Sequence, residues 1–150
     1  MQTFLPEATF EASASVLDYR RLGKQRVECL QLLNALSLGP KFQRPSDKRI
    51  VSTPWYNHPA CKMWVGYEAS LIEYGKVICL EWIRRGYKDT CLAKIGMFKK
   101  RFGSSCADPY WYTEDFRTSH KSNLIRKLPS HYGPIWPGVP SDIPYIWPIQ

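Results

Sequence analysis

Two charged segments of the chain have residue types and spacings suited to chemistry on a phosphate-rich partner. The first, residues 17–28, has the sequence LDYRRLGKQRVE and contains four cations and two acids. If this segment is helical, a four-residue step places Arg20, Lys24 and Glu28 on one face, with Arg21 beside them. That face fits either a Lys24–Glu28 surface ion pair or a carboxylate held among cations next to a phosphate backbone.

Arg26 departs from this polar pattern. It projects toward the apolar side of the same helix, where Leu22, Cys29 and Leu33 recur at helical spacing. A charge on an apolar face needs an ion partner or a ligand. We therefore expect Arg26 to be paired or to bind the same phosphate-rich partner.

The second segment, residues 116–127, has the sequence FRTSHKSNLIRK. Its cations, hydroxyls, amide and histidine are all donors that can contact phosphate oxygens. His120 lies four residues from both Phe116 and Leu124, so a core position is the alternative, although the neighbouring cations favour a ligand role. The phosphate contacts expected from this segment are Arg117, His120, Lys121, Asn123, Arg126 and Lys127.

The other two histidines are weaker candidates. His58 either caps the helix that Pro59 begins or contacts phosphate, and His131 lies in a Pro-rich segment. Three separated histidines without an acidic cluster predict no metal site. The patterns of P-loop hydrolases, dinucleotide enzymes, common serine hydrolases, zincins and zinc deaminases do not occur in the sequence, so we expect no cofactor.

Composition supports a polyanionic partner. The 150 residues carry a formal net charge of +8, and aromatic residues make up 14% of the chain. Clustered cations attract phosphate, and aromatic faces accept unpaired bases. The sequence contains no apolar run near the roughly 20 residues that span a bilayer, so we expect no membrane segment. Five cysteines without a C-x-x-C pair favour a reducing, cytoplasmic location with the cysteines in the core.

Hydrophobic periodicity predicts an all-α fold: one domain, residues 1–150, built as a compact bundle of about four helices. Residues 1–12 and 40–57 are expected to be an irregular arm and a surface loop. Residues 128–150, with six prolines, are expected to form an extended arm rich in proline and aromatic residues. The expected helices span residues 13–37, 59–85, 89–101 and 113–127.

This layout resembles the pyrimidine dimer DNA glycosylases of the phage endonuclease V type over most of the chain. The strongest likeness lies in residues 58–64, in Tyr67-Glu68 and in residues 81–90, EWIRRGYKDT. Weaker but ordered likeness lies at Tyr19-Arg20, Arg26-Val27, residues 122–127, Pro129 and Tyr132-Gly133.

The resemblance implies base flipping from damaged duplex DNA, attack of an N-terminal α-amine on the sugar C1′, a Schiff base and strand nicking. An α-amine, with an ordinary pKa of about 7.7–8.0, is partly neutral near pH 7. Gln2 is bulky, so Met1 is expected to stay and to supply the amine. Where the family carries an acid after the Tyr-Arg pair, this chain has Arg21; Glu28 reaches the same place if the helix is shifted or broken at Gly23, and Asp18 is the alternative.

We therefore expect a monomeric DNA glycosylase, with possible AP-lyase activity, acting on damaged or modified pyrimidines in double-stranded DNA. Met1 and Glu28 are the expected catalytic residues, and His58 and the cations of both segments are the expected DNA contacts. One alternative is a catalytically silent module that recognises distorted or modified DNA by its shape. Another is a protein-interaction surface formed by the tryptophans and the Pro-rich arm.

Overall fold

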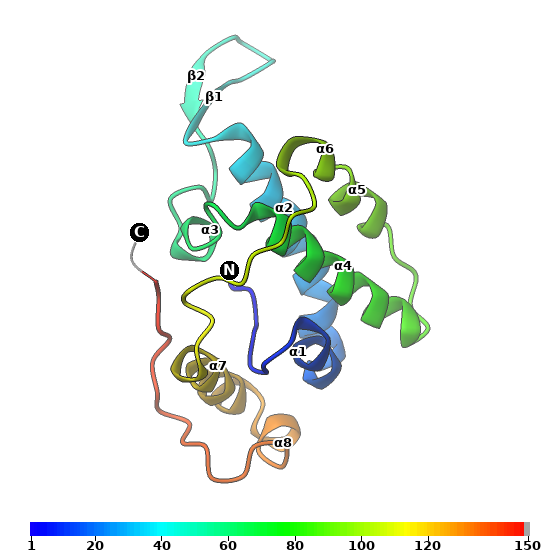
Figure 1. Cartoon of the computed structure of the whole chain (residues 1–150), viewed down its shortest axis with the longest axis vertical. Coiled ribbons are helices and arrows are strands. Elements are labelled where there is room, and N and C mark those ends of the chain that lie inside the picture. The colour runs from blue at the N-terminus through cyan, green and yellow to red at the C-terminus, as the bar shows by residue number, and fades with distance from the viewer. Residues whose placement is uncertain (149–150) are drawn as a thin grey trace.

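The centre of the molecule is a pair of long helices, α2 (Tyr19–Leu38) and α4 (Glu68–Arg84), which pack along each other (Figure 1). The computed structural model describes residues 1–148 and confirms the all-α expectation. Close packing depends on Gly75, because a Cβ there would lie 2.5 Å from Cys29 Sγ. The apolar stripes predicted for both helices face this interface, and their central residues are fully buried: Leu22, Cys29, Leu33, Leu71, Tyr74 and Ile78.

The first predicted helix is two helices with a corner between them. Helix α1 (Phe10–Val16) starts after the cap Thr9, and α2 starts after Asp18, whose carboxylate accepts a 3.4 Å hydrogen bond from Arg21 N. A single helix over residues 13–37 was therefore wrong. Asp18 is extended (ψ 155°), and a side-chain cap of this kind begins a new helix.

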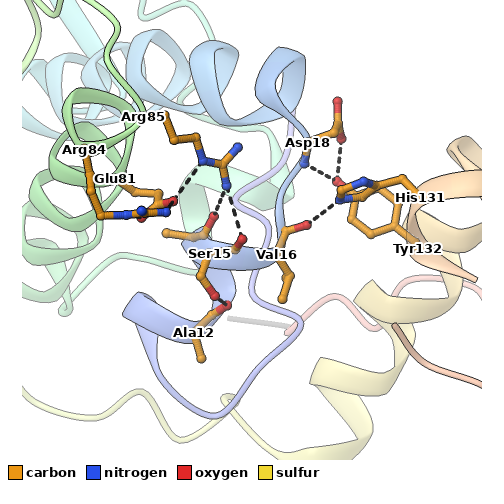
Figure 2. Close-up of polar contacts among 10 residues, drawn as sticks. Ala12, Ser15, Val16, Asp18, Glu81, Arg84, Arg85, His131 and Tyr132 are labelled. Carbon is orange, nitrogen blue, oxygen red and sulfur yellow. Dashed lines mark hydrogen bonds and ion pairs between the residues drawn. The ribbon is translucent and has the colours of Figure 1, made fainter. Parts of the chain in front are cut away.

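Polar contacts hold this corner from two sides (Figure 2). From α4, Arg85 donates to the carbonyl oxygens of Ala14 and Ser15, each at 3.2 Å. From the short helix α8 (Pro129–Tyr132), His131 Nε2 lies 2.9 Å from Val16 O, and the Tyr132 hydroxyl binds Asp18. The corner, and with it the start of α2, is fixed between α4 and α8.

The second predicted helix is also interrupted. His58 caps α3 (Pro59–Lys62) by accepting a hydrogen bond from Ala60 N, as one reading of the sequence predicted. Residues 63–67 then turn before α4, and Gly66 takes a φ of 87°, which a side chain would oppose. Trp64 is fully buried in this turn. Its place in the apolar stripe therefore predicted its burial correctly and its helical conformation wrongly.

The expected loop at residues 40–57 contains a small antiparallel hairpin, β1 (Lys41–Gln43) and β2 (Ile50–Ser52), with Phe42 opposite Val51. The hairpin extends away from the helices in Figure 1. Strands of three residues leave too short an alternation to be found in the sequence.

The third predicted helix consists of two short ones, α5 (Leu92–Gly96) and α6 (Lys99–Phe102), with a turn between them. The fourth is confirmed as α7 (Glu114–Lys127), capped by Thr113. Of the cysteines, Cys106 is exposed and the other four are buried, so the core expectation was wrong for Cys106 alone.

The C-terminal segment begins with α8, which the expected extended arm did not include. Residues 133–148 carry no helix or strand, and residues 149–150 of the expected arm lie outside the described residues. Trp136 is buried and stacks on Tyr132 with 5.5 Å between ring centroids. Further on, Ile143 N donates to Ser122 Oγ at 2.9 Å, so α7 holds this segment against the helices.

Candidate active site and nucleic-acid interface

Met1 and Glu28 line the same cleft, although 27 positions of sequence separate them. The cleft has a volume of about 840 Å³ and lies where the N-terminal arm crosses α2. Its other lining residues come from the arm, from α2 and from the C-terminal third of the chain: Gln2, Phe4, Asp18, Tyr19, Arg20, Arg21, Lys24, Gln25, Lys127, Leu128, His131 and Tyr145.

The N-terminal arm is built into the core. Residues 2–6 are buried, and side chains from distant helices bind their backbone and side-chain atoms. Trp64 Nε1 donates to Thr3 Oγ1 at 3.2 Å, Leu5 N donates to His120 Nδ1 at 3.0 Å, and the Tyr74 hydroxyl donates to Phe4 O at 3.0 Å. These bonds fix the point from which Met1 enters the cleft.

Gln25 connects the arm to Glu28. Its side chain is 1% exposed, and its Oε1 accepts hydrogen bonds from Phe4 N at 3.1 Å and from the Tyr74 hydroxyl at 2.5 Å. Its Nε2 donates to Gln2 O at 2.7 Å and to Glu28 Oε2 at 3.1 Å. One buried amide therefore sets the position of the arm relative to the carboxylate.

Glu28 is 8% exposed, and Lys24 Nζ lies 3.6 Å from its Oε1. Helix α2 runs unbroken through Gly23, so the break on which the role of Glu28 was expected to depend does not occur. Glu28 reaches the cleft because the arm runs along the turn of α2 that carries Gln25. The helix did not have to move toward the amine.

Asp18 also lines the cleft, but its carboxylate is engaged in the fold. It caps α2, lies 3.2 Å from Arg21 Nη1 and accepts from the Tyr132 hydroxyl. Burial raises the pKa of Asp18, but hydrogen bonds from Tyr132 and Arg21 lower it below the ordinary value. An acid held in this way is ionised and occupied, which favours Glu28 over Asp18 as the reactive carboxylate.

Four of the predicted DNA-binding cations gather at the cleft. Arg20, Arg21 and Lys24 come from the first turns of α2, and Lys127 comes from the last turn of α7. Arg20 is exposed and its Nε donates to the Tyr19 hydroxyl at 3.1 Å. A positive rim around a buried acid suits a phosphate backbone that passes over a reactive sugar.

Arg26 lies elsewhere, in an internal ion pair. Its Nη1 is 2.6 Å from Asp89 Oδ1, and its guanidinium lies over the Trp82 ring, 4.4 Å from the centroid. The expectation that Arg26 must be paired or ligand-bound is met by the pair. In this conformation Arg26 does not line the cleft, so its predicted DNA contact has no geometric support.

The other residues of the second predicted cluster do not line the cleft. Arg117 donates to Tyr112 O at 3.1 Å, and Lys121 lies 5.9 Å from the centroid of the Trp136 ring. Asn123 is buried and donates to Ser119 O and Ile143 O, and Arg126 is exposed and bound to Ser141 O and Asn123. Lys121, Asn123 and Arg126 therefore contact the C-terminal segment, and Arg117 contacts the residues that precede α7.

His120 is fully buried, so it contacts no phosphate in this conformation and the predicted ligand role is corrected to a core role. Its Nδ1 accepts from Leu5 N, and within residues 1–148 its Nε2 has no hydrogen-bond partner. Burial lowers the pKa of His120 to about 3. The imidazole is therefore neutral and anchors the arm.

This neutral histidine predicts acid sensitivity. The unfolded chain binds a proton at His120 below pH 6.5, and the folded chain does so only near pH 3, so stability is full above pH 6.5 and falls as the pH drops. Between pH 7 and pH 5 the free energy of unfolding should fall by about 2 kcal/mol from this group. Urea denaturation at both pH values measures it, and His120→Gln should lose that part of the pH dependence. An unchanged dependence in the variant would contradict the assignment.

His58 interacts electrostatically with the charged N-terminus. Burial lowers the pKa of His58, the positive N-terminal amine lowers it further, and Glu28 acts in the opposite sense. Trp55 and Trp147 pack edge-on against the His58 ring, each at 5.9 Å. His58 therefore belongs to the surroundings of the amine, next to an aromatic group that the sequence did not connect with it.

The cleft residues that were not predicted as site residues include Gln25, His131 and Tyr145. Gln25 had a signal, because an amide three residues after Leu22 and four before Cys29 lies on the buried face and needs buried partners. His131 and Tyr145 had none, since only the path of the C-terminal segment brings them to the cleft.

The described residues also bear on metal sites and membrane segments. Within residues 1–148, His, Cys, Asp and Glu side chains form no group of three or more that could hold a metal ion. In the same range, no helix has the length and apolar character needed to cross a membrane.

Comparison with known proteins gives one match. The family model described as pyrimidine dimer DNA glycosylase matches residues 1–95, which contain Met1, Gln25, Glu28 and His58. No curated protein and no solved structure matches the chain. The match covers most of the chain and assigns, at the level of the family, a DNA glycosylase role with DNA as the substrate. The chain belongs to the pyrimidine dimer DNA glycosylase family.

Proposed function

We propose that this protein excises a damaged or modified pyrimidine from double-stranded DNA, with the Met1 α-amine as the nucleophile. The observation that carries the proposal is that Met1 and Glu28 line one cleft, and that the Gln25 amide binds both Glu28 and the backbone oxygen of Gln2, the residue next to Met1. An amine and a carboxylate at one sugar are the groups that this type of displacement needs.

In the proposed reaction, the neutral amine forms a bond to C1′ as the bond from C1′ to the base breaks, and the departing base takes a proton from water. One amine proton then moves to O4′ as the bond from C1′ to O4′ breaks, which opens the sugar ring and leaves a protonated Schiff base between Met1 and C1′. Glu28 stabilises the positive charge that develops on the sugar and then on the amine. An AP-lyase step follows if a proton is lost from C2′ and the bond from C3′ to its phosphate oxygen breaks.

The rim cations have a binding role in this proposal. Arg20, Arg21, Lys24 and Lys127 hold the phosphates on either side of the target nucleotide. A damaged base is easier to unstack than a paired one, so extrusion contributes selectivity before the chemical step.

Borohydride trapping tests the proposed chemistry. Purified protein is mixed with duplexes that carry an abasic site, a cyclobutane dimer or a modified pyrimidine, and sodium borohydride reduces any imine to a stable adduct. We expect an adduct at Met1, located by peptide mass spectrometry. A short N-terminal extension, which moves the amine away from the cleft, should abolish the adduct, and the same extension at the C-terminus should not.

The outcomes separate the candidate functions. An adduct that survives the N-terminal extension would contradict Met1 as the nucleophile. Salt-sensitive binding without adduct or base release on any of these duplexes would contradict the enzyme and assign the silent DNA-binding module.

A further inference from the structure

Trp55 is an exposed tryptophan in a backbone conformation that large residues avoid. It follows β2, its side chain is 48% exposed, and its φ is +68°. A bulky residue in the left-handed region carries conformational strain. Trp55 O accepts from His58 N at 3.0 Å and Thr53 O accepts from Tyr56 N at 3.3 Å, so turns on both sides hold the strained residue in place.

Trp55 ends a row of rings that leads from the cleft. Tyr145 lines the cleft, Trp147 lies 5.6 Å from Tyr145, and His58 lies between Trp147 and Trp55 at 5.9 Å from each. The positive charge of the N-terminal amine lowers the pKa of His58. The exposed indole is therefore linked to the cleft through three successive ring contacts, and the turns around it hold it at the surface.

The hairpin that precedes Trp55 presents cations. Arg44 is bound to Asp47, with Nε 3.0 Å from Oδ1. Lys41, Lys48 and Arg49 are exposed on the same hairpin, which extends away from the helices (Figure 1). Exposed cations beside an exposed ring are the combination that binds unpaired nucleotides, with phosphate on the charges and the base on the ring.

We propose that Trp55, supported by His58 and Trp147, is a stacking subsite for an unpaired nucleobase, and that Lys41 and Arg49 bind the phosphates that flank it. The ligand class is a base that has left the duplex stack at the lesion. This subsite rests on the proposed function in one respect, that DNA lies in the cleft beside Met1. It does not depend on imine formation.

The test uses a duplex that binds without reacting. It carries a tetrahydrofuran abasic analogue, which has no C1′ hydroxyl and forms no imine, with 2-aminopurine opposite as the fluorescent unpaired base. Binding is measured by anisotropy and stacking by quenching of 2-aminopurine. Trp55→Ala should weaken binding to this duplex by roughly tenfold to a hundredfold and remove the quenching, with less than about threefold effect on an undamaged duplex.

Two further variants control for folding and for aromatic loss in general. Trp55→Phe keeps a ring and should retain most of the affinity and quenching. Tyr87→Ala removes another exposed ring, which lies after the C-terminal end of α4, and should change neither the affinity nor the quenching. Equal losses on damaged and undamaged duplexes, or no loss for Trp55→Ala, would overturn the stacking subsite.

The hairpin cations are tested by salt dependence. Replacing Lys41 and Arg49 together with Gln should reduce the slope of log affinity against log salt concentration by up to about 1.8, the value for two phosphate contacts. An unchanged slope would show that the hairpin cations do not contact phosphates and would overturn this part of the proposal.

Failure of this subsite and failure of the proposed chemistry give different results. Borohydride trapping in wild type without quenching of 2-aminopurine would overturn the subsite and leave the amine chemistry in place. If the wild type gives no adduct but quenches 2-aminopurine, and Trp55→Ala loses that quenching, the subsite is supported and the chemistry is overturned.

Discussion

Glu28→Gln should lower base release from a lesion-containing duplex by about 10²–10⁴-fold, with the dissociation constant for that duplex changed by less than about threefold. Glutamine has nearly the same shape and keeps an oxygen for the Gln25 amide, but it lacks the negative charge that would stabilise the sugar cation. The effect should appear in single-turnover base release, where the chemical step is observed directly.

Asp18→Asn is the matched control for this prediction. Asp18 lines the same cleft, but it is bound to Arg21 and Tyr132. Asn keeps the helix cap, but its replacement of Asp18 should reduce the free energy of unfolding, since the ion pair with Arg21 and the charge-assisted hydrogen bond from Tyr132 are lost. Base release by the folded protein should stay within about tenfold. If Asp18→Asn removes base release and Glu28→Gln does not, the two carboxylates must exchange roles.

Gln25→Met should reduce both stability and chemistry. The variant fills a similar volume but makes none of the four hydrogen bonds of the amide, so it leaves Phe4 N and Gln2 O without this partner. We expect a loss of about 2–5 kcal/mol in the free energy of unfolding. We also expect a fall of at least about tenfold in the single-turnover rate at saturating DNA, because a misplacement of about 1 Å weakens a positioned nucleophile strongly.

Tyr74→Phe separates the positioning role from stability. It removes a hydrogen bond to Gln25 Oε1 and one to Phe4 O, and it leaves the bond from Gln25 to Glu28 in place. At a temperature where each variant is fully folded, Tyr74→Phe should retain a near wild-type rate and Gln25→Met should not. Equal rates in both variants would mean that Gln25 only stabilises the fold.

Local patterns predicted the parts of the fold that depend on neighbouring residues. Thr113 with two acids after it indicated the start of α7, and His58 with Pro59 indicated the start of α3. The apolar periodicity of residues 64–82 located core residues correctly. In each case the energy that decides the structure lies within one or two helical turns, where the sequence is informative.

The same patterns passed over the breaks in the chain. The apolar pattern continued across residues 17–18 and 63–67, where the structure has a corner and a turn. Arg85 and His131 hold the corner, and the buried Trp64 and a 2.8 Å hydrogen bond from Trp111 to Met63 O hold the turn. His120 was placed at a ligand site for a similar reason. The neighbouring cations Arg117 and Lys121 are only half-buried, whereas the side chain of His120 is fully buried and binds Leu5, which lies 115 positions away.

The sequence by itself determined that the chain is helical and basic and that it carries an amine, a few acids and the cations of a DNA-binding protein, because these properties follow from composition and local spacing. Only the tertiary structure placed both candidate acids in the cleft with Met1 and engaged one of them, Asp18, in the fold. The Gln25 amide binds the arm 21 to 23 positions away, and Tyr74 and His120 bind it across 70 and 115 positions. Hydrogen bonds between such distant residues depend on how the helices pack, and the packing is a property of the whole chain.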